Sequence, residues 1–496
     1  MFSTRIYRGG LSALVLLLFA LPAVAQSFRV QCPEETPLHP KSAAGVVSDG
    51  IKCQQISGGD GYATMGDGTQ TYLFAFGPLS GLTDIQNGLP GTQKASVFRK
   101  PIDIEPNAAV GLVPDPDAGG AITGHVDARA IMDVGVMNGN MPAPTMAIDE
   151  DDEFFLTLTN VGMIMRPDLF EQHTVHFHGY PNASSFYDGV PDASVAINIG
   201  GSFTYYYLAP DAGTYFWHCH ITPPEHLQMG MVGQIYVRPR QNRVPAGASL
   251  YAALKDQQND PRTKCGADIL CSTPLPAKDN GATHKPNKSG SPTLYAYNDG
   301  DGSTAYDIEY PIQIHGFDPN FHFVGMTFNP EPFTDMKDKY FLLNGRSYPD
   351  TLTAGAMSTP VADGTPHFSQ PLPTLINIPV GGKALLRISD LDVSEFQTLA
   401  SLGIPMHVVG VNARLLRDMA GNNLAYDTNS ITLGGGESID VILDASDMNL
   451  HPAGSTYYLY TPNLDHLSND AENFGGLMTE VHICKTVDPT TKVCAN

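Results

Sequence analysis

Short stretches of alternating apolar and polar residues, separated by turn-forming residues, occupy most of the chain. Alternation with a period of two is typical of strands, in which successive side chains point to opposite faces of a sheet. The longer apolar period of extended amphipathic helices is absent from the sequence. We therefore predict an all-β protein with two blocks of strands. The first block holds Thr71–Phe76, Glu153–Thr159, Thr174–His178, Ser202–Leu208, Gly213–Cys219 and Val232–Val237, and the second holds Tyr310–Ile314, Lys383–Ser389, Met406–Leu416, Ser438–Leu443, Thr456–Tyr460 and Leu477–Ile483.

The two blocks share a layout that indicates a duplicated β-sandwich domain. Asn138-Gly139 opens one and Asn344-Gly345 opens the other, and each is followed by a proline, a strand pair and a histidine-bearing strand. The segment between the blocks is rich in Asn, Lys, Gly, Pro and Ser, which is typical of a linker. The expected boundaries are an N-terminal arm at 26–60, a first domain at 61–240, a linker at 241–305, a second domain at 306–485 and a C-terminal tail at 486–496.

The start of the chain predicts export. Arg5 and Arg8 give a basic beginning, an apolar stretch runs from Leu11 to Leu21, and a run of small residues ends at Ala25. This order is typical of a signal peptide, which we place at residues 1–25. Neither this apolar stretch nor any later one is long enough to span a bilayer. We expect a periplasmic or secreted protein that has no membrane partner.

Charge and cysteine content narrow the expected environment. The chain has 28 Lys and Arg against 51 Asp and Glu, a balance that disfavours nucleic acid and anionic membranes as partners. Six of the seven cysteines form near pairs in the sequence, which in an oxidising compartment predict disulfides. The seventh, Cys219, stands between two histidines. The near pairs are Cys32 with Cys53, Cys265 with Cys271, and Cys484 with Cys494.

Six histidines gather in two short segments around Cys219. One segment runs from His173 to Gly179, and the other begins at Trp217 and continues past Cys219 to Met231. Because side chains alternate along a strand, the cysteine faces away from the histidines on either side of it. The alternation therefore predicts two metal sites, back to back.

The site on the cysteine side has the ligands of a blue electron-transfer copper, which are one thiolate, two imidazoles and a distant methionine. We assign them to Cys219, His173, His226 and a methionine. Met231, five residues beyond His226, is our choice for the axial ligand, and Met229 is the alternative. On the opposite side, four neutral imidazoles without a thiolate suit a copper that binds oxygen species. They are His176, His178, His218 and His220.

The segment from Asn138 to Arg238 resembles a multicopper oxidase domain. The resemblance rests on His176-Phe177-His178-Gly179, Tyr187-Asp188-Gly189-Val190-Pro191 and Gly213-Thr214-Tyr215-Phe216-Trp217-His218-Cys219-His220. It implies cupredoxin-like Greek-key β-sandwich domains and an oxidase that transfers electrons from a small-molecule or metal-ion reductant to dioxygen. It also implies type 1 copper ligands at His173, Cys219, His226 and Met231, a type 2 ligand at His176, type 3 ligands at His178, His218 and His220, and a carboxylate at Asp188 that assists proton delivery.

Two departures keep other functions open. His226 follows Cys219 by seven residues, where the family usually has five, and copper nitrite reductases have a longer loop still. His176, however, occupies the position of the catalytic aspartate in those reductases, which favours an oxidase. A one-copper electron carrier or copper-handling protein is the third reading. The number of coppers per chain distinguishes the oxidase, the nitrite reductase and the electron carrier.

The second domain resembles the family less closely than the first. In two-domain relatives, this domain of a neighbouring chain completes a trinuclear copper cluster, which implies a homotrimer. Here His407 matches a ligand position, whereas Val409, Asn412 and Pro462 stand where relatives have histidine. The remaining candidates for extra ligands are His315, His322, His407 and His466.

Overall fold

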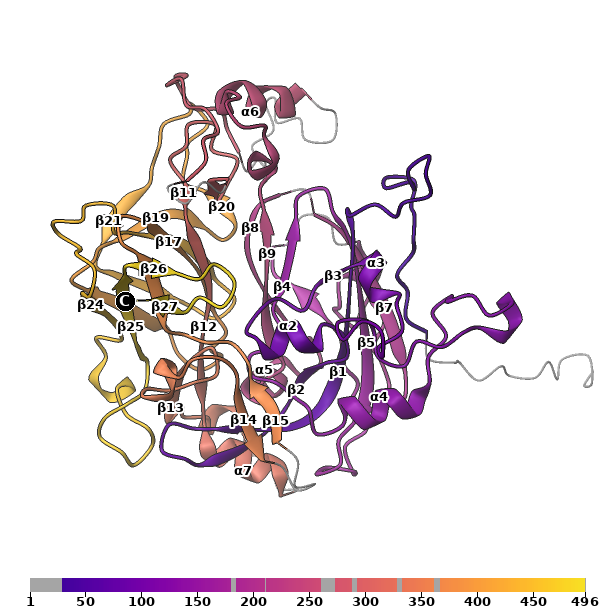
Figure 1. Cartoon of the computed structure of the whole chain (residues 1–496). Helices are drawn as coiled ribbons and strands as arrows, with labels where there is room; N and C mark the ends of the chain where they lie inside the picture. Colours follow the sequence, from indigo (N-terminus) through magenta and orange to yellow (C-terminus); the bar gives the residue numbers. More distant parts are fainter. Residues whose placement is uncertain are drawn as a thin grey trace, which may run out of the picture.

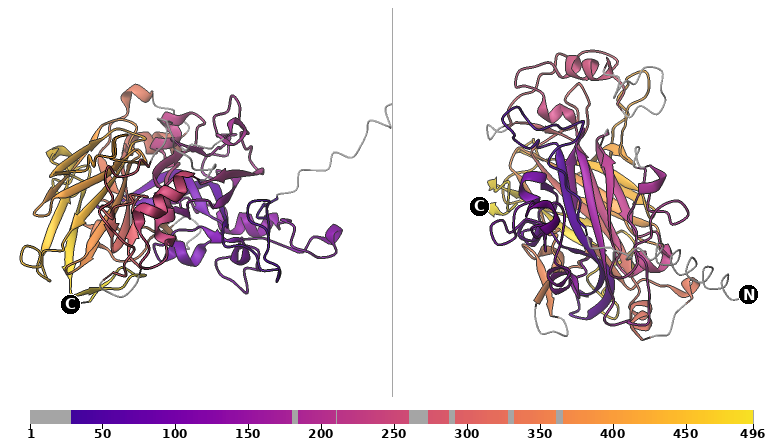
Figure 2. Two further views of the ribbon diagram at one scale, coloured as in Figure 1. Left: turned by 90° about the horizontal axis from the view of Figure 1, so that it is seen from above. Right: turned by 90° about the vertical axis from the view of Figure 1, so that its right-hand side faces the viewer.

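The computed structural model describes residues 29–179, 184–209, 211–259, 273–287, 292–327, 332–360 and 366–495. In this part of the chain two β-rich domains lie side by side, the first indigo to magenta and the second orange to yellow (Figure 1). Figure 2 shows the same two halves from above and, in its right panel, with the first domain in front of the second. The all-β prediction is confirmed, because strands dominate both domains and the helices are short.

The first domain is a sandwich of two sheets. The strand orders are β2-β1-β5-β7, with β3 paired to β1, and β4-β9-β8-β6. Alternate residues of β5, such as Phe154 and Leu156, are fully buried and pack with Trp217 and Ile235 of the other sheet. The strands are β1 (Ile51–Thr64), β2 (Gln70–Pro78), β3 (Gln93–Lys94), β4 (Met146–Asp149), β5 (Glu153–Gly162), β6 (His176–Phe177), β7 (Ser202–Leu208), β8 (Gly213–His218) and β9 (Val232–Arg238).

The second domain repeats this plan with two larger sheets. Their orders are β13-β12-β17-β23-β19-β20, with β21 paired to β19, and β16-β25-β24-β18-β22. A second apolar core, which includes Ile312, Leu386 and Leu459, lies between them. The strands are β12 (Ile308–Phe317), β13 (Tyr340–Leu343), β16 (Ile376–Pro379), β17 (Lys383–Asp390), β18 (Gln397–Leu402), β19 (Met406–Val411), β20 (Arg414–Leu415), β21 (Tyr426–Thr428), β22 (Ser430–Leu433), β23 (Ser438–Asp444), β24 (Thr456–Tyr460) and β25 (Met478–Cys484).

Short helices and small hairpins complete the described structure. Among the helices, α7 belongs to the second domain by sequence but packs on β2 of the first. No helix of the described residues is long and apolar enough to cross a membrane. The helices are α2 (Leu82–Gln86), α3 (Ala95–Phe98), α4 (Ala128–Gly135), α5 (Pro223–Gln228), α6 (Leu250–Asn259) and α7 (Pro319–Met326), with 3-10 turns η1 (Pro116–Ala118), η2 (Ser185–Tyr187), η3 (Arg240–Arg243), η4 (Phe333–Asp335), η5 (Asp350–Leu352) and η6 (Leu464–His466). The hairpin strands are β10 (Leu294–Tyr295) with β11 (Ala305–Tyr306), β14 (Met357–Pro360) with β15 (Pro366–Gln370), and β26 (Thr486–Val487) with β27 (Cys494–Ala495).

Polar contacts join the two domains where β8 and β9 face β12, β17 and β23. Glu309 of β12 accepts hydrogen bonds from Arg238 of β9 and from Arg387 of β17. Burial alone would raise the pKa of Glu309, but the two guanidinium groups outweigh it and hold that pKa well below its usual range. Thr214 of β8 also donates a hydrogen bond to Asp440 of β23. The domains are therefore joined through charges and hydrogen bonds as well as apolar packing.

Some parts of the chain differ from the organisation expected from the sequence. The first sheet begins at Ile51, inside the range that the sequence assigned to the N-terminal arm. The expected linker contains regular structure, including α6 and β10. The predicted disulfides between Cys32 and Cys53 and between Cys484 and Cys494 are confirmed. The predicted signal peptide and the third cysteine pair lie outside the described residues.

Candidate metal centre

Strand pairing brings the two histidine segments together. β6 and β8 are antiparallel neighbours, and their register sets His176 directly opposite His218. Cys219 follows the last residue of β8, and its main-chain N–H donates to the carbonyl of Met231 at 3.1 Å. Its sulfur in turn accepts a hydrogen bond from the main-chain N–H of Thr174 at 3.4 Å. Both histidine segments and Met231 are therefore held by main-chain bonds around one cysteine.

The first group of convergent side chains is His173, Cys219 and His226, whose ligand atoms all lie within 4.8 Å of one another. Cys219 Sγ lies 3.2 Å from His226 Nδ1 and 4.0 Å from His173 Nδ1. All three residues are fully buried. His173 Nε2 has no hydrogen-bond partner among the described residues. The ring is therefore held by packing and by the contact of its Nδ1 atom with Cys219 Sγ.

Met231 and Met229 have different neighbours. A side-chain carbon added at Gly58 of β1 would stand 2.8 Å from His173 Cδ2 and 3.3 Å from Met231 Cε, so both side chains occupy the space beside this glycine. Met229 instead packs next to Gly325 of α7. The absence of a side chain at Gly58 thus creates the room in which the imidazole and the thioether meet.

The electrostatics of this group suit a cation. Burial alone would raise the pKa of the Cys219 thiol, but His226 and His173 outweigh it and bring that pKa well below its usual range. Burial alone would lower the pKa of His226, yet the Cys219 sulfur and Glu171 raise it to about 9. These directions favour a thiolate at Cys219 and a proton on the facing His226 nitrogen. One thiolate, two Nδ1 atoms and an adjacent thioether fit a copper ion that would replace this proton.

The second group is His176, His178 and His218, whose ligand atoms also lie within 4.8 Å of one another. His176 Nδ1 donates to the main-chain carbonyl of Asp188, and His218 Nδ1 donates to that of Cys219, each at 2.7 Å. Because a carbonyl can only accept, these bonds place the proton on Nδ1 and leave Nε2 with a free lone pair. Bonds of this kind orient the ring in many metal sites.

The remaining geometry of this second group also suits a metal ion. His178 Nε2 lies 3.0 Å from His218 Nε2. The ring centroid of His220 is 4.9 Å from that of His176, and its Nδ1 atom is buried without a hydrogen-bond partner among the described residues. Burial, followed by the neighbouring histidines, lowers the pKa of His178 to about 4. This shift favours the neutral form of His178, which is the form that binds a metal.

The other candidates from the sequence lie elsewhere. His407 bonds Asp427, and His466 stacks on Phe341 with ring centroids 3.7 Å apart. His315 and His322 lie at the domain boundary, where they bond main-chain carbonyls of α5. The Asp188 carboxylate, Oδ2, lies 3.5 Å from His176 Nδ1 and is partly exposed. Asp188 therefore accompanies the second group, whereas the four second-domain histidines join neither group.

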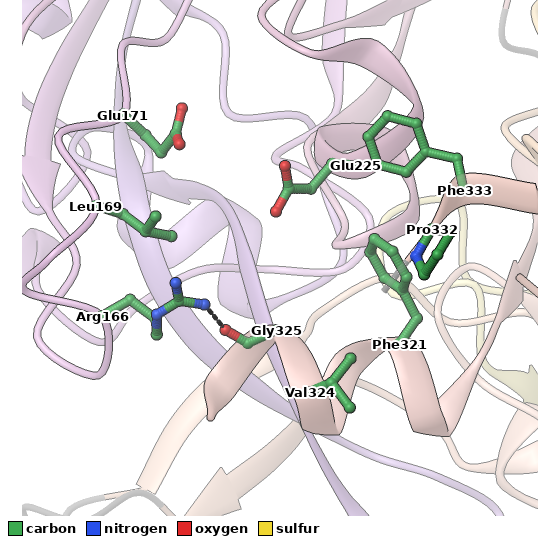
Figure 3. Close-up of a pocket in the computed structure, with 9 residues that line it drawn as sticks. All are labelled: Arg166, Leu169, Glu171, Glu225, Phe321, Val324, Gly325, Pro332 and Phe333. Atoms are coloured by element: carbon green, nitrogen blue, oxygen red, sulfur yellow. Dashed lines mark hydrogen bonds between the residues drawn. The ribbon is translucent and has the colours of Figure 1, made fainter. Parts of the chain in front are cut away.

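A cavity of about 370 Å³ opens beside the first group, between the two domains (Figure 3). Glu171 and Glu225 come from the first domain, and the rings of Phe321 and Phe333 come from the second (Figure 3). Glu171 Oε2 lies 3.5 Å from His226 Nε2, at the outer limit of a hydrogen bond. One residue of the cavity wall, Glu171, therefore contacts the far edge of a candidate copper ligand.

Sequence reasoning missed this cavity. Its only local signal is that acidic residues stand two positions before His173 and one before His226, at Glu171 and Glu225. The aromatic wall comes from α7 and η4, more than ninety residues further along the chain, and no sequence pattern places it there.

Comparison with known proteins agrees with this geometry. Residues 123–242 match the family model described as multicopper oxidase. "Laccase abr2" of Aspergillus fumigatus is 34% identical over 109 residues, which are 22% of this chain and 17% of that protein. "Laccase-1" of Emericella nidulans is 34% identical over 131 residues, 25% of this chain and 18% of that protein. The chain thus spans less than a fifth of the length of either relative. A solved multicopper oxidase, mgLAC, shares the fold at 15% identity, with a TM-score of 0.50 over 89% of this chain and 93% of that one.

Proposed function

From the match of residues 123–242 to the multicopper oxidase family model, we propose that the protein is a copper-dependent oxidase. It would take electrons from a reducing substrate at a type 1 copper and deliver them to dioxygen at the histidine group on the other side of Cys219. The observation that carries the proposal is the back-to-back arrangement of the two groups, which share the backbone of a single His-Cys-His segment.

At the type 1 site the chain's own residues fix the ligands before any metal arrives. Cys219 supplies a thiolate, and His173 and His226 supply Nδ1 atoms within 4.8 Å. Met231 supplies the thioether next to Gly58. Bound copper would provide a one-electron redox centre in this position. Because the site is fully buried and tied by main-chain bonds, the ligands need little movement between oxidation states.

The route between the two groups runs through covalent bonds. Cys219 is bonded in sequence to His218 and His220, so one strand end carries a ligand of the first group and two residues of the second. The Nδ1 atom of His218 also donates to the Cys219 carbonyl at 2.7 Å, which adds a hydrogen bond to the covalent path. Asp188, next to His176, is positioned to pass protons from solvent to this side of the domain.

The reducing substrate would bind in the cavity of Figure 3. Leu169, Phe321 and Phe333 offer apolar surface to an aromatic ring. Glu171, in contact with His226, offers an acceptor for a phenolic proton. Besides its apolar wall, the cavity is lined by the carboxylates of Glu171 and Glu225 and by Arg166. The apolar wall favours a small phenol over a bare metal cation, which would leave the aromatic rings unused.

Two confirmed disulfides support export. Cys32–Cys53 and Cys484–Cys494 join a terminal segment to a strand in each domain, and such bonds persist in oxidising compartments. The periplasm and the cell exterior both meet this condition.

Oxygen uptake tests the function. The copper-loaded protein should consume dioxygen when supplied with 2,6-dimethoxyphenol, and Cys219→Ser should abolish the uptake, because serine cannot provide the thiolate. A matched control is Ser394→Ala, a small change to a side chain outside both groups. Nitrite turnover without oxygen uptake would replace the oxidase with a nitrite reductase. A single copper with neither activity would indicate an electron carrier.

A further inference from the structure

We infer that the second histidine group holds one copper ion rather than a three-copper cluster, so that each chain binds two coppers in all. The inference rests on the proposed function only in taking the metal to be copper. A three-copper cluster of the multicopper oxidase type takes histidines from two domains. The ligands described here come from the first domain alone.

Three ring atoms converge on one point in the second group. His176 and His218 each donate Nδ1–H to a carbonyl, so the lone pair of each ring lies on Nε2. His178 directs its Nε2 at that of His218, 3.0 Å away. The three ligand atoms lie within 4.8 Å of one another, which suits a single ion between them. His220 lies at the edge of this triangle, with its ring centroid 5.1 Å from that of His218.

The rest of the chain has no histidine to add. Of the 16 histidines in the sequence, five belong to the two groups and His220 lies at the edge of the second. Each of the other ten lies in the described residues and contacts a different partner. These partners are Glu153 for His39, Asp115 for His125, Thr293 for His284, Leu227 for His315, Gln228 for His322, Asn138 for His367, Asp427 for His407, Tyr457 for His451, Gln397 for His466 and Glu480 for His482.

The second domain closes the group without offering imidazoles. A cavity of about 380 Å³ beside His178 is lined from the second domain by Asn412 and residues 435–438. A side-chain carbon added at Gly436 would stand 2.6 Å from His178 Nδ1, so the main chain itself lies against that ring. Val409 is buried in an apolar cluster. The side that would face a cluster therefore presents main chain, the Asn412 amide, the Ser438 hydroxyl and the Glu437 carboxylate, but no imidazole.

Oligomer formation would add at most a few histidine ligands to this group. A neighbouring copy brings the same second domain, in which Val409, Asn412 and Pro462 replace histidine. Its His407, half-exposed on β19, is the one residue at a family ligand position that could reach across. Four imidazoles, or five with a neighbour's His407, would leave three coppers with fewer than two protein ligands each. A single copper would have three or four, which is the usual number for imidazole sites.

The test is a copper count with a spectroscopic partition on the full-length, copper-reconstituted protein. We expect two coppers per chain by mass spectrometry of the metal, and both should be visible by electron paramagnetic resonance of the oxidised protein. One should show the narrow hyperfine splitting of a type 1 site and the other the wide splitting of a nitrogen-ligated site. Three or four coppers per chain, an EPR-silent coupled pair, or one copper alone would overturn the inference.

Two variants locate the second copper. His176→Ala should lower the count from two to one while the blue absorption of the type 1 site persists, which also shows that the variant is folded. His407→Ala should retain two, and loss of copper in this variant would overturn the single-chain site. Failure of the proposed function has a different signature. A protein with two EPR-visible coppers that consumes no oxygen would refute the oxidase and leave the copper count intact.

Discussion

Replacing Glu309 by glutamine tests the ion cluster that joins the two domains. The Glu309 side chain is 11% exposed and that of Arg387 is fully buried. Glu309 accepts a hydrogen bond of 2.7 Å from Arg238 and one of 2.9 Å from Arg387. Because an amide carries no charge, Glu309→Gln would leave two guanidinium groups facing each other across the domain boundary. The carboxylate of Asp440, 3.8 Å from Arg387 Nη1, would then compensate in part.

The expected loss in the free energy of unfolding follows from the burial of this ion cluster. Removing one partner of a buried ion pair costs about 3–5 kcal/mol, and the glutamine carbonyl still accepts one hydrogen bond, so we expect about 3 kcal/mol at pH 7. The two arginines hold the pKa of Glu309 well below its ordinary value of 4.5. Its contribution to stability is therefore fully present above that value and is lost as the pH falls below it. The stability difference between wild type and variant should shrink on acidification.

Guanidinium unfolding of the metal-free protein, followed by the fluorescence of the single tryptophan, Trp217, measures this difference between pH 7 and pH 3. A matched control is Asp49→Asn, whose ion pair with Lys94 is exposed on both sides and should contribute nothing measurable. Wild-type stability of Glu309→Gln at pH 7 would refute the reasoning. So would a difference that stays constant across the pH range.

Four further outcomes test the metal centre. Cys219→Ser should remove the intense blue absorption of the copper-loaded protein with an unchanged circular dichroism spectrum, and a retained blue band would exclude the thiolate ligand. Gly58→Ala should shift that band, since its new carbon would stand 2.8 Å from His173 Cδ2; an unchanged band would show that β1 can move away freely. Glu171→Gln should lower kcat/KM for phenols about tenfold, the loss of one charged hydrogen bond, at constant copper content, whereas unchanged kinetics would place the substrate elsewhere. Thiol titration of the unfolded, metal-free mature protein should find one free thiol, and three or more would contradict the predicted disulfides.

The ligands around Cys219 could be predicted because their information is local. Strand alternation alone separates Cys219 from His218 and His220. The structure places His218 at the end of β8, opposite His176 of β6, and Cys219 and His220 follow directly. The choice between Met229 and Met231, by contrast, depends on Gly58, a residue more than 160 positions earlier in the chain. The spacing from His226 favours Met231, which lies beside His173. The contacts that place Met231 there cannot be read from this spacing.

Strand β1 was not predicted from the sequence because of its glycines. The run Ser57-Gly58-Gly59-Asp60-Gly61 has the composition of a loop, yet it lies in the middle of the first sheet. Close packing explains the composition, because a side-chain carbon at Gly61 would stand 2.6 Å from the carbonyl oxygen of Gly139. A sequence read for apolar alternation cannot distinguish glycines that form a turn from glycines that make room for a neighbouring chain segment.

The position of α7 has a consequence for the order in which the site is assembled. Domains fold largely as units, and the N-terminal one folds first during synthesis. The candidate ligands His173, Cys219 and His226 all belong to the first domain, whereas the Phe321 wall of the nearby cavity comes with α7 of the second. A growing chain would thus complete its copper ligands before it builds the wall that borders them. Copper binding and formation of the substrate cavity would then be successive steps in the folding of one chain.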